Sequence, residues 1–354
     1  MKQKSILAFC LLMSIATGLF SCKKNKDAAP STLTVDTFAG SGIGGDADGS
    51  GPVAQFSAPI AMTADAQGNI FVASGSAIKK ITPAGQVSTF AGIYNIAGFT
   101  DGTGVQARFS NPLGMSTDPQ GNVYVADYGN QRIRKISPAG LVTTIAGNGT
   151  IGSNNGNGSA AQFNYPYDIA YDGTTGCLFV ADYQNNRIRK IDAAGNVSTY
   201  AGSAPGFADG TVSSALFFGP MGVAADKQGN VFVSDRYNHR VRKITNTGTV
   251  STVAGSSNVG LTNGPLATAL FSGSINELEV DNDGNIYLAD RDNYCVRKIS
   301  STEVTTYAGS GIAGYVEGAP GTAQFNGVFG LALYGNTVYV ADLNNHRVRR
   351  ISYK

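Results

Sequence analysis

The chain has 354 residues, 46 of them glycine, and a net charge of only +2, from 26 basic and 24 acidic side chains. This balance disfavours a nucleic-acid partner, because proteins that bind the phosphate backbone carry a concentrated basic surface. A chain of this length can bury an ample apolar core, and because it has no tryptophan, 16 Tyr and 17 Phe must supply the aromatic packing.

The first 21 residues have the pattern of an export signal. Lys2 and Lys4 precede an apolar run over residues 5–20, which is too short for a comfortable membrane span. The run is followed by Ser21-Cys22, which resembles a bacterial lipobox, where the cysteine is lipidated and becomes the mature N-terminus. We therefore predict a lipoprotein signal peptide over 1–21, lipidation at Cys22 and a polar tether over 22–32. An ordinary signal peptide with an incidental cysteine is the alternative.

Lipidation at Cys22 predicts a protein anchored to the bacterial outer membrane, since several acyl chains give a stable anchor. The run Ser-Cys-Lys-Lys is similar to that of lipoproteins of the Bacteroidota, some of which use an acidic run after the cysteine for surface display. The run here is basic. The periplasmic side and the surface side therefore both remain open.

Beyond residue 33, one phrase recurs in six copies. It is clearest as GNVYVADYGNQRIRKI from Gly121. Its anchor residue is an aspartate in every copy but the first, and successive anchors lie 52 to 55 residues apart. The anchors are Ser74, Asp127, Asp182, Asp235, Asp290 and Asp342. Repetition at this period indicates identical supersecondary units packed side by side.

Each unit is predicted to be four short antiparallel strands. In the second copy, β-branched and apolar runs over 114–118, 123–126, 132–136 and 141–145 are separated by turn sequences such as Asp-Pro-Gln-Gly-Asn. Such a sheet cannot bury both faces alone, whereas sheets placed radially bury them against their neighbours. The prediction is an all-β fold, a six-bladed β-propeller over residues 33–354.

The ends of the repeat array predict how the ring closes. The sixth copy stops at residue 354 and lacks a fourth strand, whereas residues 33–40, ahead of the first copy, match the fourth strand of the others. The N-terminal strand should therefore complete the last blade, which removes two exposed sheet edges.

The linkers between units also repeat. Each carries a phenylalanine at a fixed offset, preceded at seven residues by a glycine that follows Asp, Asn or Glu. We expect an ordered loop, a capped helical turn whose phenylalanine fills the seam between blades. The phenylalanines are Phe56, Phe109, Phe163, Phe217, Phe271 and Phe325.

The phrase GN(I/V)(Y/F)VAD-x-x-N-x-R(I/V)RKI resembles the NHL-repeat family of β-propellers over nearly the whole predicted mature chain. The resemblance implies a six-bladed propeller. It leaves function open, because members serve as protein-binding or RNA-binding platforms and related propellers are lyases and lactonases.

The repeated charges are interpreted as scaffold. Each anchor aspartate is expected to pair with the arginine five residues on and so to brace the turn between them. The pairs are Asp127–Arg132, Asp182–Arg187, Asp235–Arg240 and Asp342–Arg347. In the fifth copy Cys295 replaces this arginine, and Arg291 is expected to compensate. The second basic pair of each unit, such as Arg134-Lys135, is expected to be a solvated strand face.

Departures from the repeat predict the binding site, since function overrides scaffold at such positions. The starts of the innermost strands hold small or apolar residues except in two blades. The lead-in, the short segment between the linker phenylalanine and the innermost strand, gains one residue in the fifth copy and lacks the usual proline there. We predict a ligand pocket at the channel mouth, with Asp168 and Glu277 as candidate Ca²⁺ ligands; hydrated polar residues at a wet channel opening are the alternative. The predicted pocket residues are Tyr167, Asp168, Asn276, Glu277 and Phe329.

These features predict a non-catalytic cell-envelope platform that binds a protein, peptide or glycan through the face with the long linkers, without nucleic acid and without a cofactor beyond possible Ca²⁺. The alternative is a metal-dependent propeller hydrolase, lactonase or lyase with Asp168 and Glu277 as its site. His239 and His346, the two histidines of the chain, occupy equivalent turn positions and are interpreted as repeat residues instead of catalytic bases.

Overall fold

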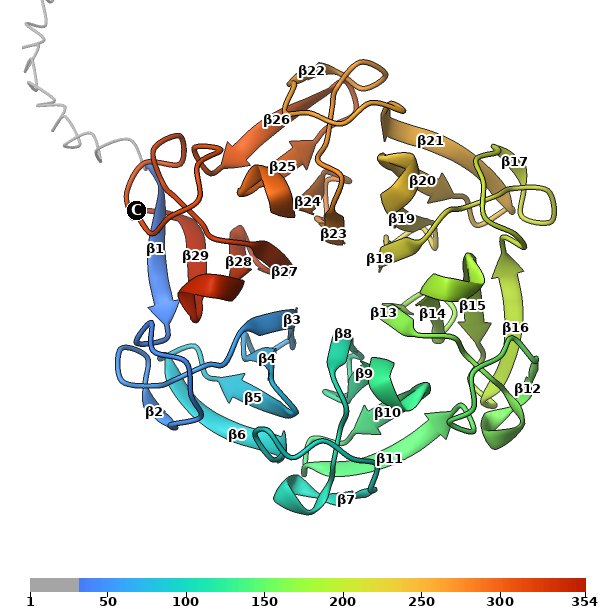
Figure 1. The fold of residues 1–354 in the computed structure, drawn as a ribbon, viewed down its shortest axis with the longest axis horizontal. Helices are drawn as coiled ribbons and strands as arrows, with labels where there is room; N and C mark the ends of the chain where they lie inside the picture. Colours follow the sequence, from blue (N-terminus) through green and yellow to red (C-terminus); the bar gives the residue numbers. More distant parts are fainter. Residues whose placement is uncertain (1–31) are drawn as a thin grey trace, which may run out of the picture. The chain divides into compact units, whose positions relative to one another are not determined.

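The computed structural model describes residues 32–354, which form a six-bladed β-propeller (Figure 1). The sheets stand around a central channel, each with its first strand innermost. The predicted signal peptide, the lipidation site Cys22 and the predicted tether up to residue 31 lie outside the described residues. Within residues 32–354, no helix has the length and apolar character needed to cross a membrane.

Blade two shows how the repeat folds. Its sheet runs from the innermost strand β8 (Pro112–Thr117) through β9 (Val123–Asp127) and β10 (Arg132–Ile136) to β11 (Leu141–Ala146). A fifth strand, β7 (Gly102–Thr103), pairs with the outer edge of β11. The prediction of four strands was therefore one strand short here and in four other blades, because this two-residue strand comes from the linker and has no strand-like sequence pattern.

The remaining blades repeat this order with small changes of length. From the innermost strand outward they are, in blade one, β3 (Pro59–Ala64), β4 (Ile70–Ser74), β5 (Ala77–Ile81), β6 (Gln86–Gly92) and β2 (Gly49–Ser50); in blade three, β13 (Pro166–Asp172), β14 (Cys177–Asp182), β15 (Arg187–Ile191), β16 (Asn196–Ala201) and β12 (Gly156–Asn157); in blade four, β18 (Pro220–Ala225), β19 (Val231–Asp235), β20 (Arg240–Ile244), β21 (Thr249–Gly255) and β17 (Gly210–Thr211); in blade five, β23 (Ile275–Val280), β24 (Ile286–Asp290), β25 (Cys295–Ile299), β26 (Glu303–Ala308) and β22 (Gly264–Pro265).

Blade six closes the ring as predicted. Its strands are β27 (Val328–Tyr334), β28 (Thr337–Asp342), β29 (Arg347–Tyr353) and, on the outside, the N-terminal strand β1 (Leu33–Ala39). β1 pairs with β29 in antiparallel register, from Leu33 opposite Tyr353 to Ala39 opposite Val348. A fifth strand is reduced here to one bridge between Val35 and Gly318.

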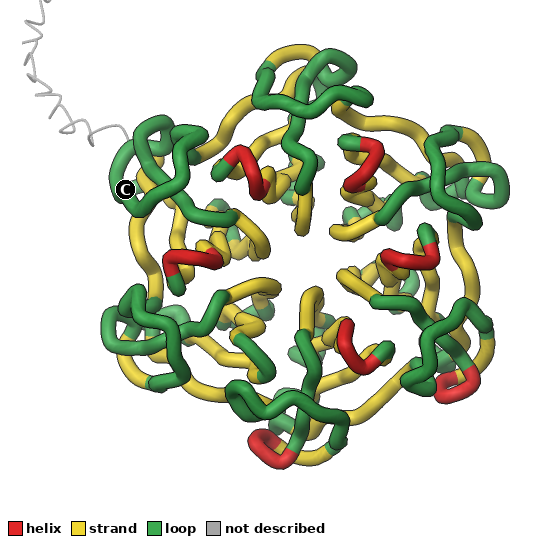
Figure 2. The backbone as a smooth tube through the Cα atoms, viewed as in Figure 1, coloured by secondary structure: helices red, strands yellow, loops and turns green. Residues whose placement is uncertain are grey.

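The linkers lie on one face of the ring, and we call this the linker-bearing face (Figure 2). It also carries the short 3-10 turns that join the second and third strands of blades two to six: η2 (Tyr128–Asn130), η4 (Tyr183–Asn185), η5 (Arg236–Asn238), η6 (Arg291–Asn293) and η7 (Leu343–Asn345). Among the described linkers, a helical turn forms only in two, as η1 (Gly104–Gln106) and η3 (Gly158–Ala160). The expected capped turn is thus confirmed only in part.

The six linker phenylalanines fill the seams between blades, as predicted. All six are fully buried. Phe109, for example, packs in one cluster with Phe71 of blade one and Val123 of blade two. Burying a large aromatic side chain of this kind contributes on the order of 2–3 kcal/mol to stability.

The anchor aspartates pair with a different arginine from the one predicted. Asp127 accepts a hydrogen bond at 2.7 Å from Arg134, seven residues on, and the same pairing joins Asp182 to Arg189, Asp235 to Arg242, Asp290 to Arg297 and Asp342 to Arg349. These arginines are fully buried. The expected pairs with Arg132, Arg187, Arg240 and Arg347 are therefore wrong. The second basic pair of each unit, such as Arg134-Lys135, was expected to be solvated, and this prediction is wrong for its arginine.

The buried arginine also explains the fixed offsets in the linker. Arg134 bridges Asp127 to Asp101 of the preceding linker, at 2.6 Å, and donates to the carbonyl oxygens of Thr100 and Arg108. In blade one Lys79 takes this place and binds Asp46 and Asp48.

In three blades the arginine predicted to pair stacks on an aromatic ring of the linker instead. The Arg132 guanidinium lies 3.6 Å from the centre of the Phe99 ring, and Arg240 and Arg347 lie similarly on Phe207 and Tyr315. Such cation–π contacts stabilise by roughly 0.5–2 kcal/mol.

Blade five departs from this pattern without the expected compensation. Cys295 takes the place of the stacking arginine, and Leu261 stands at the position of the linker aromatic. Asp290 still binds Arg297, whereas Arg291 lies over the Phe329 ring at 5.4 Å. The prediction that Arg291 compensates for Cys295 was therefore wrong.

Candidate functional site

Six side chains close the channel at the linker-bearing face, one from the start of each innermost strand. They are Ile60, Leu113, Tyr167, Met221, Asn276 and Phe329. Tyr167 and Phe329 come from opposite blades and stack across the axis, with ring centres 6.2 Å apart and planes 16° apart. Together with Leu113 and Met221 they form one buried apolar cluster. Two of the predicted pocket residues are thus brought together, but they fill the mouth instead of lining an open pocket.

We call these six side chains the plug, and further aromatic rings surround it. Tyr128 lies 4.8 Å from Tyr165 and 6.0 Å from Tyr167, measured between ring centres. On the other side, the Tyr183 and Tyr237 hydroxyl oxygens are 2.7 Å apart.

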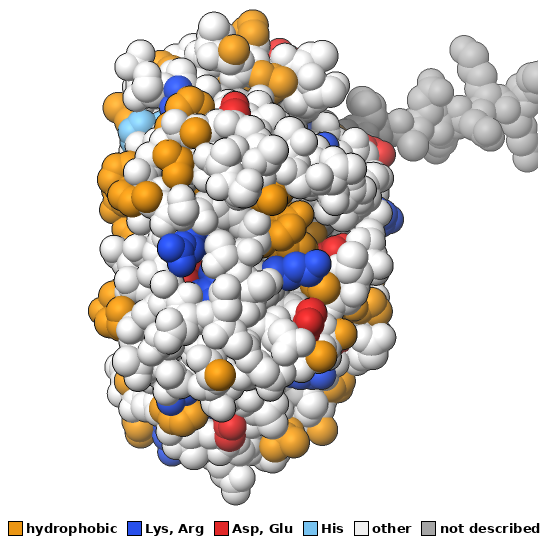
Figure 3. All heavy atoms as spheres, turned by 90° about the vertical axis from the view of Figure 1, so that its right-hand side faces the viewer, with side chains coloured by type: hydrophobic (Ala, Val, Ile, Leu, Met, Phe, Trp, Pro, Cys, Tyr) orange, Lys and Arg blue, Asp and Glu red, His pale blue; other side chains and the backbone are white. Residues whose placement is uncertain are grey.

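The series ends at the surface with Phe218, whose ring centre is 4.8 Å from that of Tyr237, and both side chains are 42% exposed. We call Tyr128, Tyr165, Tyr183, Phe218 and Tyr237 the aromatic patch. Hydrophobic side chains also gather along the left-hand edge of Figure 3, which is the linker-bearing face seen from the side.

Asp168 and Glu277 lie one layer below the plug and connect neighbouring blades. The Asp168 carboxylate accepts hydrogen bonds from the backbone N–H of Val223, in blade four, and of Ile169, both at 2.8 Å. Glu277 accepts one at 2.6 Å from the backbone N–H of Leu331, in blade six. These bonds occupy oxygens that the sequence assigned to a ligand.

Glycines in the neighbouring blades make room for these carboxylates. A Cβ atom on Gly114 would lie 2.3 Å from Oδ1 of Asp168, and one on Gly330 would lie 2.7 Å from Oε2 of Glu277 and 2.0 Å from the carbonyl oxygen of Ile60. Glycine is therefore needed at these strand starts, because any side chain there would collide with the acidic residue of the neighbouring blade.

Beneath the plug, the channel contains a cavity of about 100 Å³ lined by Asp168, Glu277 and Glu279. Burial raises the pKa of Asp168 to about 7. Burial, and then the charge of Asp168, raise the pKa of Glu279 to about 8 and that of Glu277 well above its usual range. At neutral pH these carboxyls can therefore hold protons. In residues 32–354, no group of three or more His, Cys, Asp or Glu side chains is arranged to hold a metal ion.

Blades four and five place several buried polar atoms without hydrogen-bond partners at the seam between them. The Asn276 side chain is fully buried, and neither its oxygen nor its nitrogen has a partner within the described chain. The Ser274 hydroxyl, the Arg236 Nε and the His239 Nδ1 are also unpaired. Only Asn276 was predicted from the sequence. The inserted residue and missing proline of this lead-in were the available signal for Ser274.

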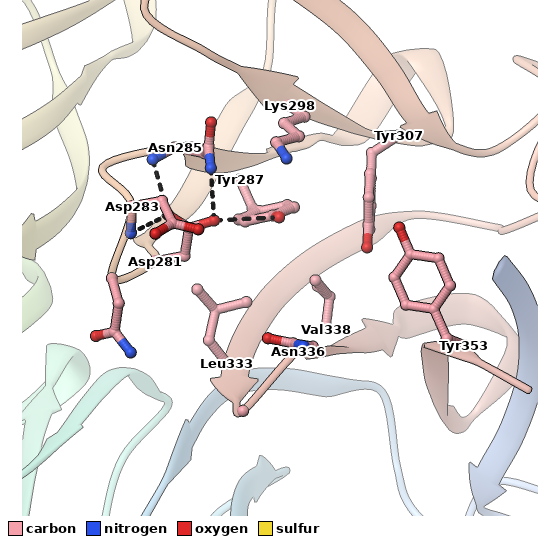
Figure 4. Close-up of a pocket in the computed structure, with 12 residues that line it drawn as sticks. Asp281, Asp283, Asn285, Tyr287, Lys298, Tyr307, Leu333, Asn336, Val338 and Tyr353 are labelled. Atoms are coloured by element: carbon pink, nitrogen blue, oxygen red, sulfur yellow. Dashed lines mark hydrogen bonds between the residues drawn. The ribbon is translucent and has the colours of Figure 1, made fainter. Parts of the chain in front are cut away.

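A separate pocket of about 260 Å³ lies at the seam between blades five and six, where the turns between first and second strands meet (Figure 4). Tyr287, Tyr307 and Tyr353 line it together with Lys298 and Leu333. Blade six turns between β27 and β28 through only Gly335 and Asn336, which leaves the seam hollow. The dashed lines in Figure 4 show that Asp281 is engaged by its own turn and by Tyr287. This pocket was not predicted from the sequence.

Comparison with known proteins supports the repeat assignment. The family model described as NHL repeat matches residues 109–136 and 219–244. The Arabidopsis thaliana protein "SUPPRESSOR OF QUENCHING 1, chloroplastic" is 30% identical over 275 residues, which cover 72% of this chain and 26% of the plant protein. Human NHL repeat-containing protein 2 is 35% identical over 100 residues, 27% of this chain and 14% of the relative. The chain thus spans about a quarter of the plant relative and less of the human one.

Solved structures share the fold at low sequence identity. An auxiliary nutrient binding protein from Bacteroides ovatus superposes with a TM-score of 0.68 at 18% identity, covering 92% of this chain and 77% of the other. Virginiamycin B lyase from Staphylococcus aureus superposes with a TM-score of 0.54 at 12% identity, covering 91% and 99%. The repeated phrase, the closed ring of six blades and the NHL-containing relatives together show that the chain belongs to the NHL-repeat family of β-propellers.

Proposed function

We propose that this protein is a lipid-anchored binding platform of the bacterial cell envelope, which holds a protein, peptide or glycan partner on its linker-bearing face. The observation that carries the proposal is the aromatic patch, whose rings continue from the buried plug to the exposed Phe218 and Tyr237. Tyrosine gives a large, rigid contact area at low cost in conformational entropy, and Tyr and Arg are enriched among residues that dominate binding energy.

Two further observations support binding. Arg236 lies over the Tyr237 ring at 5.0 Å, so a cation adjoins the exposed end of the patch. The structural neighbours from Bacteroides that are described as auxiliary nutrient binding proteins share the fold and are compatible with an envelope binding role.

The alternative of a carboxylate-centred hydrolase, lactonase or lyase is less well supported. Asp168 and Glu277 both accept backbone N–H groups across blade seams, which is a structural use of these carboxylates. Their cavity also lies beneath the plug formed by Tyr167 and Phe329, on the far side from the linker-bearing face.

The double variant Phe218→Ala/Tyr237→Ala tests the platform. Removing two exposed anchors should weaken binding to isolated envelope material at least tenfold, since residues that dominate an interface contribute about 2 kcal/mol or more each. Protease-treated and periodate-treated envelopes separate a protein from a glycan partner. Tyr334→Ala, equally exposed but at the β27–β28 turn on the opposite face, is the matched control. Unchanged binding by the double variant would contradict the proposal.

The variant Cys22→Ala tests the lipid anchor. Its retention in the membrane fraction would contradict anchoring through this cysteine.

A further inference from the structure

Three of the six seams between blades share a hydrogen bond that the seam between blades four and five lacks. The residue after each 3-10 turn between the second and third strands has a left-handed backbone, and at three seams its side chain accepts the backbone N–H of a residue just ahead of the innermost strand of the next blade. Gln131 accepts from Tyr165 at 2.6 Å, Asn186 from Gly219 at 2.9 Å and His346 from Ala58 at 3.1 Å. His239 occupies the same position between blades four and five, but its Nδ1 is unpaired.

The altered lead-in of blade five explains this loss. The backbone N–H of Ser274, which stands where Tyr165 stands in blade three, donates to the Ser272 hydroxyl at 3.2 Å. The inserted residue therefore allows the lead-in to satisfy its own N–H. His239 therefore lacks its usual donor at Nδ1, and its imidazole interacts instead with the backbone of Ser272, which acts to raise its pKa.

Backbone hydrogen bonds place the unpaired side chains at one corner of the channel mouth. The carbonyl oxygen of Asn276 accepts from the hydroxyl of Ser234, at the end of β19, at 2.6 Å. The carbonyl oxygen of Ser274 accepts from the backbone N–H of Arg291 at 3.2 Å. The backbone of Asn276 therefore lies beside Ser234, which precedes Arg236 by two residues in blade four. The backbone of Ser274 lies beside that of Arg291.

The two arginines bring positive charge to this corner. Arg236 and Arg291 stand first in η5 and η6, where blades two and three have Tyr128 and Tyr183. Both charges act on the buried hydroxyl of Tyr167. Within residues 32–354 neither guanidinium forms an ion pair, in contrast to the buried arginines of the scaffold.

We propose that Arg236, His239, Ser274, Asn276 and Arg291 form a subsite for an oxyanion, the carboxylate, sulfate or phosphate group of a ligand held on the linker-bearing face. This inference rests on the proposed binding function and specifies its chemistry. Guanidinium groups bind oxyanions through paired N–H donors, and the Asn amide and the Ser hydroxyl are further donors. Buried polar groups in native proteins are almost always paired. In residues 32–354, the unpaired buried side-chain atoms other than arginine Nε atoms and one Asp46 oxygen all lie at this seam, which indicates a missing ligand.

The two histidines of the chain provide the test. Untagged protein with isotope-labelled histidine is titrated with sulfate, with phosphate and with acetate at constant ionic strength, and both imidazoles are followed by NMR. We expect at least one anion to shift the His239 resonances saturably and to raise the pKa of this imidazole, which burial and the charges of Arg240 and Arg236 hold below its usual value. His346, whose Nδ1 is already paired, should not respond.

Variants decide whether the response belongs to the subsite. Arg236→Gln/Arg291→Gln should weaken the anion at least tenfold, and Asn276→Leu should weaken it while leaving the His346 resonances in place as a sign of correct folding. Arg108→Gln removes a charge from a linker on the same face and should have no effect.

A response of the sulfate and phosphate arms indicates a tetrahedral oxyanion, and a response of acetate alone indicates a carboxylate. Equal shifts of both histidines, no saturable shift with any anion, or an unchanged affinity in the double arginine variant would overturn the proposal. Because the titration needs no partner, its failure is distinct from a failure of the Phe218→Ala/Tyr237→Ala experiment.

Discussion

The seam between blades two and three and the seam between blades four and five occupy equivalent places in the ring but treat their polar atoms differently. At the first, Gln131 accepts the backbone N–H of Tyr165, and Tyr128 packs on that residue. At the second, His239 has lost this donor, and Ser274 and Asn276 are buried without partners. The regular seam pairs this N–H with a side chain of the neighbouring blade, whereas the irregular seam leaves the Ser274 hydroxyl, the Asn276 amide and the His239 Nδ1 without partners.

The difference between the two seams bears on both stability and function. A buried polar group without a partner lowers stability by about 1–3 kcal/mol, so the irregular seam is less stable than the chain could make it. Leucine, methionine or isoleucine occupies the position of Asn276 in three other blades. Residues that cost stability at a surface with exposed aromatic rings are candidates for binding.

The largest effect should come from breaking a fully paired network. Arg134→Ala leaves Asp127 buried without its counter-charge, and we expect the free energy of unfolding to fall by about 3–5 kcal/mol. Arg132→Ala, which removes a partly exposed stacking arginine, should cost about 1 kcal/mol or less. Urea denaturation of the two variants measures both values. A larger cost for Arg132→Ala than for Arg134→Ala would contradict the pairing seen in the structure and favour the one predicted from the sequence.

A smaller effect of opposite sign is expected at the irregular seam. Asn276→Leu removes two unpaired polar atoms from an enclosed position and should raise the free energy of unfolding by about 1–3 kcal/mol. The reciprocal variant Leu113→Asn, in the opposite blade, places an amide in the same ring and should lower it by a similar amount. If Asn276→Leu is destabilising, then Asn276 has a structural partner and the comparison between the seams fails.

A pH-dependent effect is expected at the channel carboxyls below both seams. Burial raises the folded-state pKa of Asp168 from 3.8 to about 7, so the folded protein binds this proton more tightly than the unfolded chain does. Stability should therefore fall as the pH rises from about 4 to about 7, by a few degrees in melting temperature. Asp168→Asn should flatten this part of the profile. A wild-type melting temperature that rises over the same range, with the variant unchanged, would contradict the assignment.

Much of the architecture could be predicted from the sequence because it is local and repeated. The strand pattern, the linker phenylalanines and the match of residues 33–40 to a fourth strand recur at a fixed period and led to six blades closed by β1. The two-residue fifth strand was missed, since Gly102-Thr103 carries no alternation and pairs only because the linker lies against β11.

The partner of each anchor aspartate shows where sequence reasoning stops. Arg132 stands directly opposite Asp127 in the strand register, and Arg134 stands opposite Val125. Register alone favours Arg132. Burial decides otherwise, because the linker covers Arg134 and leaves Arg132 at the strand end beside Phe99.

The candidate site divides in the same way. Tyr167, Asn276 and Phe329 could be singled out as departures from the repeat, but the stacking of Tyr167 on Phe329 joins opposite blades and no local pattern encodes it. The use of Asp168 and Glu277 as bridges between innermost strands likewise depends on blades brought together by ring closure.

The sequence by itself determined the repeating unit, the number of blades and the strand that closes the ring, since periodic apolar residues and turn residues act over a few positions. Only the tertiary structure decided which charges pair, how the channel mouth is filled and which polar atoms are left without partners. Those outcomes depend on distances between residues far apart in the chain, which the closed ring fixes.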